Sequence, residues 1–429
     1  MRRAALLLLL AAGAAAAQTP PAAPPSARAL DLRPALADSA AIAAQLGGRL
    51  SDAAAASLLT MAPGKEVYSL YGHSGVRITD PATGLDRTYN YGTFDFEQPG
   101  FVLRFMRGQL DYLLDTAPTG QELAKYAFLE RPVVEQRLAL RPETVRALYR
   151  LLEENARPEN RAYRYDFVRD NCSTRIVDIL DAALVESGQP RVALADTAPV
   201  TFRAMLAPYQ EPMPVVDFGI DLALGAPLDR PATPREQTFL PEHLADAFDA
   251  ATVGGRPLVA ARDTILTVPG WAPQPDGPPV PLWTTLAVLA LALGVTVLRR
   301  RGRRSIARAF DAVLLGVAGL AGTVVLLLWT ATDHTVIGPN WQLAWLWPTH
   351  LAAAVRLGRP SRGLRVYAGV AAGATALVVL AWAALPQHLP LAGLPLALAL
   401  ATRLADRALA GRALAGRALA GRALAPAAM

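Results

Sequence analysis

Cysteine is almost absent from this chain, since Cys172 is the only one among 429 residues. A single cysteine can form no disulfide within the chain. In an oxidising exported compartment a free thiol is a liability, so its presence there needs a reason. Two interpretations are open at this point: Cys172 is a small buried core residue, or it is a reactive nucleophile.

Lysine and acidic residues are scarce at the C-terminal end. From Pro281 onward the sequence has fifteen Arg, no Lys and three acidic residues. The first 280 residues hold 27 basic and 33 acidic side chains, so the net charge of +6 comes from one end of the chain. Because the larger part is mildly acidic, the charge gives no support for a nucleic-acid partner, and none is expected.

The N-terminal part of the chain is expected to be exported. Residues 1–17 combine two arginines, a short apolar run and Ala15, Ala16 and Ala17, which predicts a secretory signal peptide rather than a membrane span. A Pro-rich leader follows over residues 18–35. Residues 36–266 mix helical and strand patterns and predict one α+β domain, and the Pro-rich residues 267–281 predict a linker without regular structure.

Long apolar runs dominate residues 282–405 and predict an all-α transmembrane domain. We expect five spans, at residues 281–298, 309–330, 341–355, 366–385 and 389–402. Arginines follow the first, third and fifth spans, while the alternate loops hold no Arg or Lys. The positive-inside rule then places the N-terminal domain outside and the C-terminus in the cytoplasm. Residues 406–429, which repeat "RALAG", are expected to be a basic low-complexity cytoplasmic tail.

The residues around Cys172 indicate the start of a helix. In "DNCSTRIVDILDAALVESG" a polar, turn-forming pair precedes Cys172, and apolar residues then follow at helical spacing until Gly188. Cys172 is therefore expected in the first turn or at the cap. Unpaired N–H groups and the helix dipole stabilise a thiolate at that position, which favours a nucleophile.

A thiol nucleophile needs a base, and the chain offers five histidines. His73 lies in "YSLYGHSGVRITD", residues 68–80, which predicts a strand interrupted by glycines on both sides of the histidine. The glycines would let a substrate approach the ring, although a simple β-bulge is the alternative. His243 is expected on a surface helix with a capping box at Thr233–Glu236. His334, His350 and His388 belong to the membrane region.

A third polar side chain would orient the base. The stretch "RTYNYGTFDF", residues 87–96, predicts a second strand that pairs with the first and offers Asn90 and Asp95. An antiparallel hairpin would bring Asn90 near His73, so we favour Asn90. A solvent-facing strand residue without a catalytic role is the alternative for Asn90.

Four segments resemble the Lnb N-terminal periplasmic domain family: "YSLYGHSGVRI", "YNYGTFDF", "FMRGQLDYLL" and "DFVRDNCSTRIVDIL". The resemblance extends to about residue 250. The order of a histidine strand before a cysteine helix also resembles circularly permuted papain-like folds, including the lecithin:retinol acyltransferase group and permuted NlpC-type enzymes. The resemblance implies a permuted papain-like periplasmic domain followed by a bundle of about five transmembrane helices in a bacterial inner membrane.

The resemblance also implies an activity, because Lnb-type proteins are implicated as bacterial apolipoprotein N-acyltransferases. Cys172 and His73 would take the nucleophile and general-base positions. The acyl donor would be a phospholipid in the bilayer, and the acceptor would be the amine of a lipoprotein. Backbone N–H groups at the helix start, with Asn171 or Tyr71, would meet the oxyanion. No cofactor and no metal are expected.

Other interpretations stay open. A cysteine hydrolase, acting on cell-wall peptide bonds or lipid esters, would use the same residues, and a non-catalytic envelope component would keep Cys172 buried. In the membrane region His334, Asn340 and His350 form a second candidate group. For these residues we favour interfacial anchoring together with the neighbouring tryptophans, Trp341, Trp345 and Trp347.

Overall fold

A computed structural model of the chain describes residues 50–94, 100–359 and 361–423, with the side chains of 101–102 and 411–423 left aside. The predicted signal peptide, the Pro-rich leader and Asp95 lie outside these residues. The chain forms two compact units: unit 1 contains residues up to 200 together with 231–274, and unit 2 contains residues 201–230 together with those from 275 onward. Residues 201–230, which we expected in the exported domain, therefore group with the helical unit.

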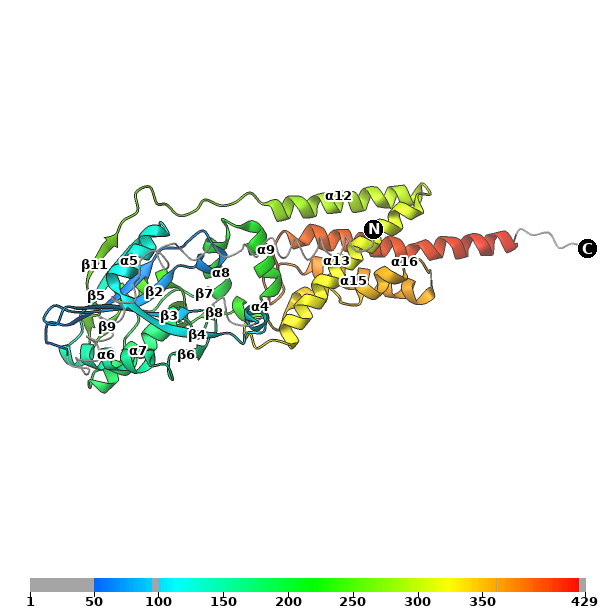
Figure 1. Cartoon of the computed structure of the whole chain (residues 1–429). Helices are drawn as coiled ribbons and strands as arrows, with labels where there is room; N and C mark the ends of the chain where they lie inside the picture. Colours follow the sequence, from blue (N-terminus) through cyan, green and yellow to red (C-terminus); the bar gives the residue numbers. More distant parts are fainter. Residues whose placement is uncertain (1–49, 95–99, 360, 424–429) are drawn as a thin grey trace, which may run out of the picture. The chain divides into compact units, whose positions relative to one another are not determined.

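Unit 1 is built on a seven-stranded sheet whose neighbouring strands all pair antiparallel (Figure 1). The strand order is β11-β5-β1-β2-β3-β4-β6. The strands are β1 (Ala55–Met61), β2 (His73–Asp80), β3 (Leu85–Thr93), β4 (Asp111–Pro118), β5 (Val133–Leu138), β6 (Ala162–Arg164) and β11 (Val259–Leu266). The mixture of helices and strands expected for the N-terminal part is confirmed.

The helices of unit 1 connect and cover these strands. They are η1 (Val67–Ser69), α4 (Phe101–Met106), α5 (Thr119–Phe128), α6 (Pro142–Ala156), α7 (Cys172–Glu186), α10 (Pro234–Gln237) and α11 (Pro241–Ala250). Short strands complete the regular structure: β7 (Val200–Thr201), β8 (Pro231–Ala232), β9 (Thr252–Val253) and β10 (Arg256–Pro257).

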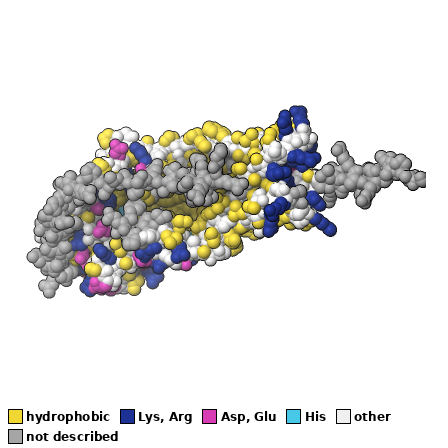
Figure 2. Space-filling model, turned by 45° about the vertical axis from the view of Figure 1, so that its right-hand side comes forward, with side chains coloured by type: hydrophobic (Ala, Val, Ile, Leu, Met, Phe, Trp, Pro, Cys, Tyr) yellow, Lys and Arg dark blue, Asp and Glu magenta, His cyan; other side chains and the backbone are white. Residues whose placement is uncertain are grey.

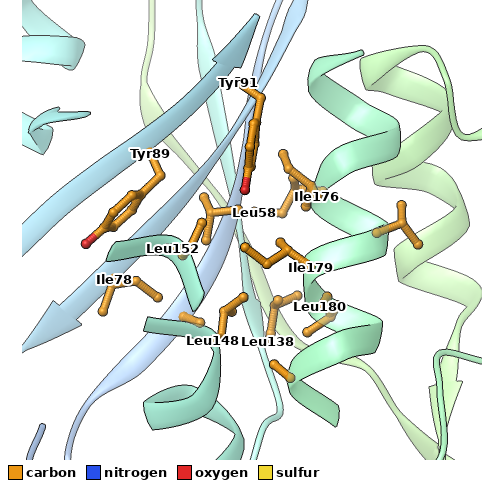
Figure 3. Close-up of a cluster of buried hydrophobic side chains, with 14 of the residues drawn as sticks. Leu58, Ile78, Tyr89, Tyr91, Leu138, Leu148, Leu152, Ile176, Ile179 and Leu180 are labelled. Carbon is orange, nitrogen blue, oxygen red and sulfur yellow. The ribbon is translucent and has the colours of Figure 1, made fainter. Parts of the chain in front are cut away.

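The main core lies between one face of the sheet and helices α6 and α7. Because side chains alternate along a strand, Tyr89 and Tyr91 of β3 both point to this face, where they are buried (Figure 3). Leu148 and Leu152 of α6 and the apolar stripe of α7 pack with them. Burial of this stripe holds the N-terminus of α7 against the sheet.

The opposite face of the sheet carries a smaller cluster, made by Leu59, Met61, Tyr126 and Val133. Tyr126 comes from α5, which places that helix on this face. Met61 pairs with His73 across β1 and β2, so the imidazole shares this face with Tyr126.

Strand β2 begins at His73, five residues later than the strand predicted from Tyr68. The preceding residues form η1 and a turn that ends at Gly72, whose φ is +77°. A Cβ at Gly72 would also lie 2.8 Å from the carbonyl oxygen of Met61. Glycine is thus required where the chain enters the strand, because other residues strain at this φ.

Unit 2 is helical. It contains α8 (Phe202–Gln210), α9 (Pro214–Ala223), η2 (Ala226–Asp229), α12 (Val280–Arg300), α13 (Arg304–Thr330), η3 (Trp341–Ala344), α14 (His350–Arg356), α15 (Arg362–Leu380) and α16 (Gly393–Ala423). Three of these, α12, α13 and α15, are long and apolar enough to cross a membrane. Figure 2 shows apolar side chains along the helical unit and Arg side chains gathered at one end of it.

The expected count of five spans is not confirmed. The predicted span 341–355 is not one helix: η3 ends at Ala344, and α14 starts only at His350, after Pro348. A proline in this position breaks a helix because it lacks an N–H and clashes with the preceding turn. The predicted span 389–402 begins before α16 and continues into it, since α16 starts at Gly393; this helix has 31 residues and includes several arginines.

Side-chain amides join residues 201–230 to the membrane helices. Asn340 donates to the carbonyl oxygens of Leu222 and Ala223 at 3.0 and 3.1 Å, and Gln387 donates to that of Leu224 at 2.9 Å. Leu222 and Ala223 carry the last two carbonyl groups of α9, and Leu224 carries the first one after it. Carbonyl groups at the end of a helix have no N–H partner within the helix, so the side-chain amides supply one. The bonds explain why this segment groups with unit 2.

Candidate functional site

Helix α7 begins at Cys172, and Asn171 is its N-cap. The side-chain oxygen Oδ1 of Asn171 accepts from the N–H groups of Ser173 and Thr174 at 2.9 and 3.1 Å. The Thr174 hydroxyl accepts from the N–H of Asn171 at 2.8 Å, which completes a capping box. The predicted helix start at Cys172 is confirmed.

The side-chain amide of Asn171 is fully engaged. Its two N–H bonds donate to the carbonyl oxygens of Phe167 and Phe239 at 2.8 and 2.9 Å, and the residue is buried. This leaves the side chain with no spare N–H for a substrate oxyanion, the role suggested from the sequence. Asn171 instead fixes the loop before α7 and the first turn that carries the thiol.

The thiol of Cys172 lies beside strands β2 and β3 and is partly exposed. A Cβ at Gly92 of β3 would be in ordinary contact with the Cys172 Cβ, at 3.5 Å, and the φ of +89° is what favours glycine there. Burial raises the pKa of the thiol, and the backbone N–H of Ser74 and the hydroxyl of Ser173 oppose this rise. Among these groups the Ser173 hydroxyl is 3.9 Å from the sulfur.

A buried serine pair connects β2 to α7. The hydroxyls of Ser74 and Ser173 lie 3.0 Å apart, and both residues are fully buried. His73 and Cys172 directly precede these two serines, so the pair holds their backbones close together. Within the described residues, no hydrogen bond joins the imidazole of His73 to the thiol of Cys172.

The imidazole of His73 is held by Asn90. Its Nε2 lies 3.3 Å from the side-chain oxygen Oδ1 of Asn90, which only accepts, so Nε2 carries the proton and Nδ1 keeps its lone pair. A Cβ at Gly75 would be 2.9 Å from the same oxygen. The second glycine of the motif therefore makes room for Asn90, rather than for a substrate as we expected.

The charge state of His73 is set by its surroundings. Burial first, and then the cationic charges of Lys125 and Arg131, lower its pKa to about 3, while the hydrogen bond that the ring donates to Asn90 opposes them. The imidazole is therefore neutral at neutral pH. Because the thiol pKa is raised, the sulfur is also protonated there, and the resting pair is uncharged.

Tyr71 stands at the entrance to β2, where its ring packs against Phe167 with centroids 5.2 Å apart. Phe167 precedes Asn171 in the loop before α7, so Tyr71 contacts the loop that leads to the thiol. The capping box at Thr233 and Glu236 is confirmed, but it belongs to α10, and His243 lies on the next helix, α11.

His350 of the second candidate group is completely buried. Its Nε2 lies 3.1 Å from the carbonyl oxygen of Trp345, and its Nδ1 lies 2.7 Å from the hydroxyl of Tyr367. Both nitrogens thus have partners inside unit 2. Asn340 caps η3 through Gln342, in addition to its bonds with α9. Both residues have structural contacts that account for their positions.

Sequence reasoning missed two sets of groups near the site. Ser74 and Ser173 join β2 to α7, and the cations Lys125 and Arg131, with Tyr126, act on the imidazole side of the sheet. One signal was available, because Lys125 and Lys65 are the only lysines in a chain with 40 arginines. Contacts between α5, the loop after it and β2 could not be read from the local sequence. No cluster of three or more His, Cys, Asp or Glu suited to a metal occurs among the described residues.

Two regions of the chain match known protein families. Residues 49–207 match the family described as the Lnb N-terminal periplasmic domain, and residues 274–410 match the Lnb transmembrane domain. No curated protein and no solved structure matches the chain. With its periplasmic domain and its transmembrane domain both matched, the protein belongs to the Lnb family of bacterial membrane proteins.

Proposed function

We propose that this protein is a cysteine-dependent acyltransferase that moves a fatty acyl chain from a phospholipid to the N-terminal amine of a diacylated lipoprotein. The observation that carries the proposal is the position of Cys172, the first residue of a capped helix, with its sulfur next to the N–H that follows His73. The order of a histidine strand before a cysteine helix supports a permuted papain-like arrangement.

The first half-reaction forms a thioester. The sulfur of Cys172 attacks an ester carbonyl carbon of the phospholipid while Nδ1 of His73 takes the thiol proton. The tetrahedral intermediate then collapses, the carbon–oxygen ester bond breaks, and His73 returns the proton to the departing lysophospholipid. Because both groups start neutral, the proton moves as attack occurs, without a preformed thiolate.

The second half-reaction uses the thioester. The α-amine of the lipoprotein attacks the thioester carbonyl, the carbon–sulfur bond breaks, and the proton lost by the amine passes through His73 to the sulfur. The backbone N–H of Cys172, at the first position of α7, is a suitable donor for the oxyanion in both steps. Asn90 keeps Nε2 protonated and the ring in one orientation.

The membrane unit suits this substrate class. Both substrates are held in a bilayer, so a catalytic domain on the same membrane meets them at a high effective concentration. We place the protein in the inner membrane as a multi-pass protein with its C-terminus in the cytoplasm. The arginines that follow α12 and precede α13 and α15 support this orientation.

The direct test is to detect the thioester. Purified full-length protein in phospholipid nanodiscs, measured by intact mass spectrometry, should carry one fatty acyl group that neutral hydroxylamine removes. Peptide mapping should place it on Cys172, and Cys172→Ala should lack it. Adding a diacylated lipopeptide should discharge the group and yield N-acylated peptide. A folded protein that carries no adduct and transfers no acyl chain would overturn the proposal, and release of free fatty acid alone would indicate a hydrolase.

A further inference from the structure

Arg131, between α5 and β5, is a buried cation with incomplete partners. Its side chain is 7% exposed, and its Nε donates to the carbonyl oxygen of Ala62 at 2.6 Å. Its Nη2 is buried and has no hydrogen-bond partner. Within the part of the chain that the structure describes, no carboxylate lies within ion-pair distance of this guanidinium. Buried charged groups are normally paired, so an open N–H here points to a missing anion.

Lys125 of α5 contacts the same aromatic ring as Arg131, that of Tyr126. Its Nζ is 5.3 Å from the centre of the Tyr126 ring, and the guanidinium carbon of Arg131 is 5.0 Å from the same centre. The nearest acid is Glu122, 3.4 Å from Nζ. Glu122 is the one carboxylate within ion-pair distance of Lys125 among the described residues, and Asp115 acts on Lys125 from farther away.

These cations stand next to the catalytic candidate. Their charges are the second and third causes of the lowered pKa of His73, after burial. Tyr126 shares the face of the sheet on which His73 lies. The tyrosine pKa is raised by burial first, and the charge of Cys172 also contributes, so the ring lies within electrostatic range of both the thiol and the cations.

We propose that Arg131 and Lys125 bind the phosphodiester of the glycerophospholipid donor, as an anion site beside His73. The proposal rests on the acyltransferase function and names the feature by which the donor is recognised. A phosphate can accept the open N–H of Arg131 and a proton of Lys125 together, since it offers several acceptor oxygens. In a glycerophospholipid this phosphate and the reacting ester share one glycerol unit, so holding the phosphate positions the ester.

The test compares two acyl donors in micelles of a detergent that contains no lipid. One donor is a phosphatidylglycerol, and the other is the diacylglycerol with the same acyl chains, which lacks the phosphate. Native protein should form acyl-Cys172 at least about tenfold faster from the phospholipid, the value of one charge-assisted hydrogen bond. Inorganic phosphate at constant ionic strength should slow the phospholipid reaction, since it occupies the same site.

The main variant is Lys125→Gln, because this side chain is half exposed and its loss needs no repacking. It should lower the rate with phospholipid by about tenfold and leave the rate with diacylglycerol within about twofold. Lys65→Gln is the matched control, because Lys65 is the other lysine, is 77% exposed and pairs with Glu130. Arg131→Lys, which keeps the charge but loses the fork, should lose part of the preference while its melting temperature stays near that of the native protein.

The outcomes separate the two proposals. Equal rates of native protein with the two donors, or a Lys125→Gln variant with the native preference, would overturn the anion site alone. Inhibition by inorganic phosphate without any preference between donors would show a site for free phosphate and overturn its role in donor binding. Absence of acyl-Cys172 with both donors would instead contradict the acyltransferase function itself.

Discussion

The hydroxyls of Ser74 and Ser173 lie 3.0 Å apart in the interior of unit 1, and this bond joins the strand of His73 to the helix of Cys172. Neither serine is a candidate for the chemistry. Their contact fixes the relative positions of the two residues that precede them, since each backbone is held at one end of a regular element. A small change here should therefore affect catalysis as well as stability.

Ser173→Ala is expected to reduce the rate of Cys172 acylation by about tenfold or more, because α7 can then shift relative to β2. The loss of one buried hydrogen bond should lower the free energy of unfolding by about 1–2 kcal/mol. Ser187→Ala is the control, because Ser187 bonds Thr144 at 2.7 Å beyond the other end of α7. The acylation rate and the thermal stability of both variants are measured. Equal losses of rate in the two variants would show that the rate falls only because the protein is less stable.

Gly75→Ala is expected to displace Asn90 from His73, because the added Cβ would lie 2.9 Å from the side-chain oxygen Oδ1 of Asn90. The imidazole would lose the acceptor that orients it, and the acylation rate should fall by about 10-fold to 100-fold. Gly120→Ala is the control, since nothing lies within 4 Å of a Cβ there. A native rate for Gly75→Ala would argue against a role for the Asn90 contact.

The pH dependence of thioester formation should lack the usual histidine inflection. The pKa of His73 is lowered to about 3, so the base stays neutral as pH falls through 6.5, and the rate should be nearly constant from about pH 5 to pH 7. Asn90→Asp places a carboxylate beside the ring, which favours the imidazolium and raises this pKa. The acidic limb of the pH–rate profile should then shift to higher pH, as measured by acylation assays that are stopped at fixed times. A native limb centred near 6.5 would contradict the neutral resting pair.

The same shift affects stability. Because the unfolded chain binds a proton at His73 near pH 6.5 and the folded chain resists it, the folded state should lose stability as the pH falls from 6.5 towards 3. His73→Gln should reduce this slope in urea denaturation of the full-length protein at several pH values. An unchanged slope would mean that other groups, such as the carboxylates, dominate acid sensitivity.

A buried charge network in unit 2 should be needed for folding. Asp311 is 1% exposed and accepts from Arg403 at 2.7 and 3.2 Å and also from Arg407. Asp311→Asn removes the counter-ion that Arg403 and Arg407 share and leaves Asp406 as the remaining ion-pair partner of Arg403, so it should cost about 3–5 kcal/mol. The double variant Asp311→Leu with Arg403→Leu should be less destabilised, because it removes both charges. Melting in detergent measures both, and a larger loss in the double variant would contradict this.

Much of the candidate site could be predicted locally. The polar pair before Cys172 and the apolar spacing after it indicated a helix that begins at the cysteine, because capping and amphipathic periodicity depend on neighbouring residues. Pairing of Asn90 with His73 followed from the hairpin. Asn171 was identified as a site residue, but its structural role could not be predicted, because its hydrogen bond to Phe239 joins residues 68 positions apart.

The membrane region shows how far amino-acid composition alone can predict membrane-spanning helices. Apolar runs identified α12, α13 and α15, because hydropathy over about 20 residues suffices for a span. The run at 341–355 looked equivalent, yet Pro348 and the bonds of Asn340 with α9 divide it. Its partner residues lie more than a hundred positions earlier, so no local pattern reports them.

The sequence by itself determined the single thiol, the helix that presents it, the histidine strand and the membrane segments, since each depends on residue type and short-range spacing. Only the tertiary structure decided what surrounds the imidazole. The charge state of His73 and the open guanidinium of Arg131 result from burial and from through-space charge, which depend on how α5, β2 and α7 pack together. Burial and electrostatic effects depend on distances in space, and the separation of two residues along the chain does not reveal those distances.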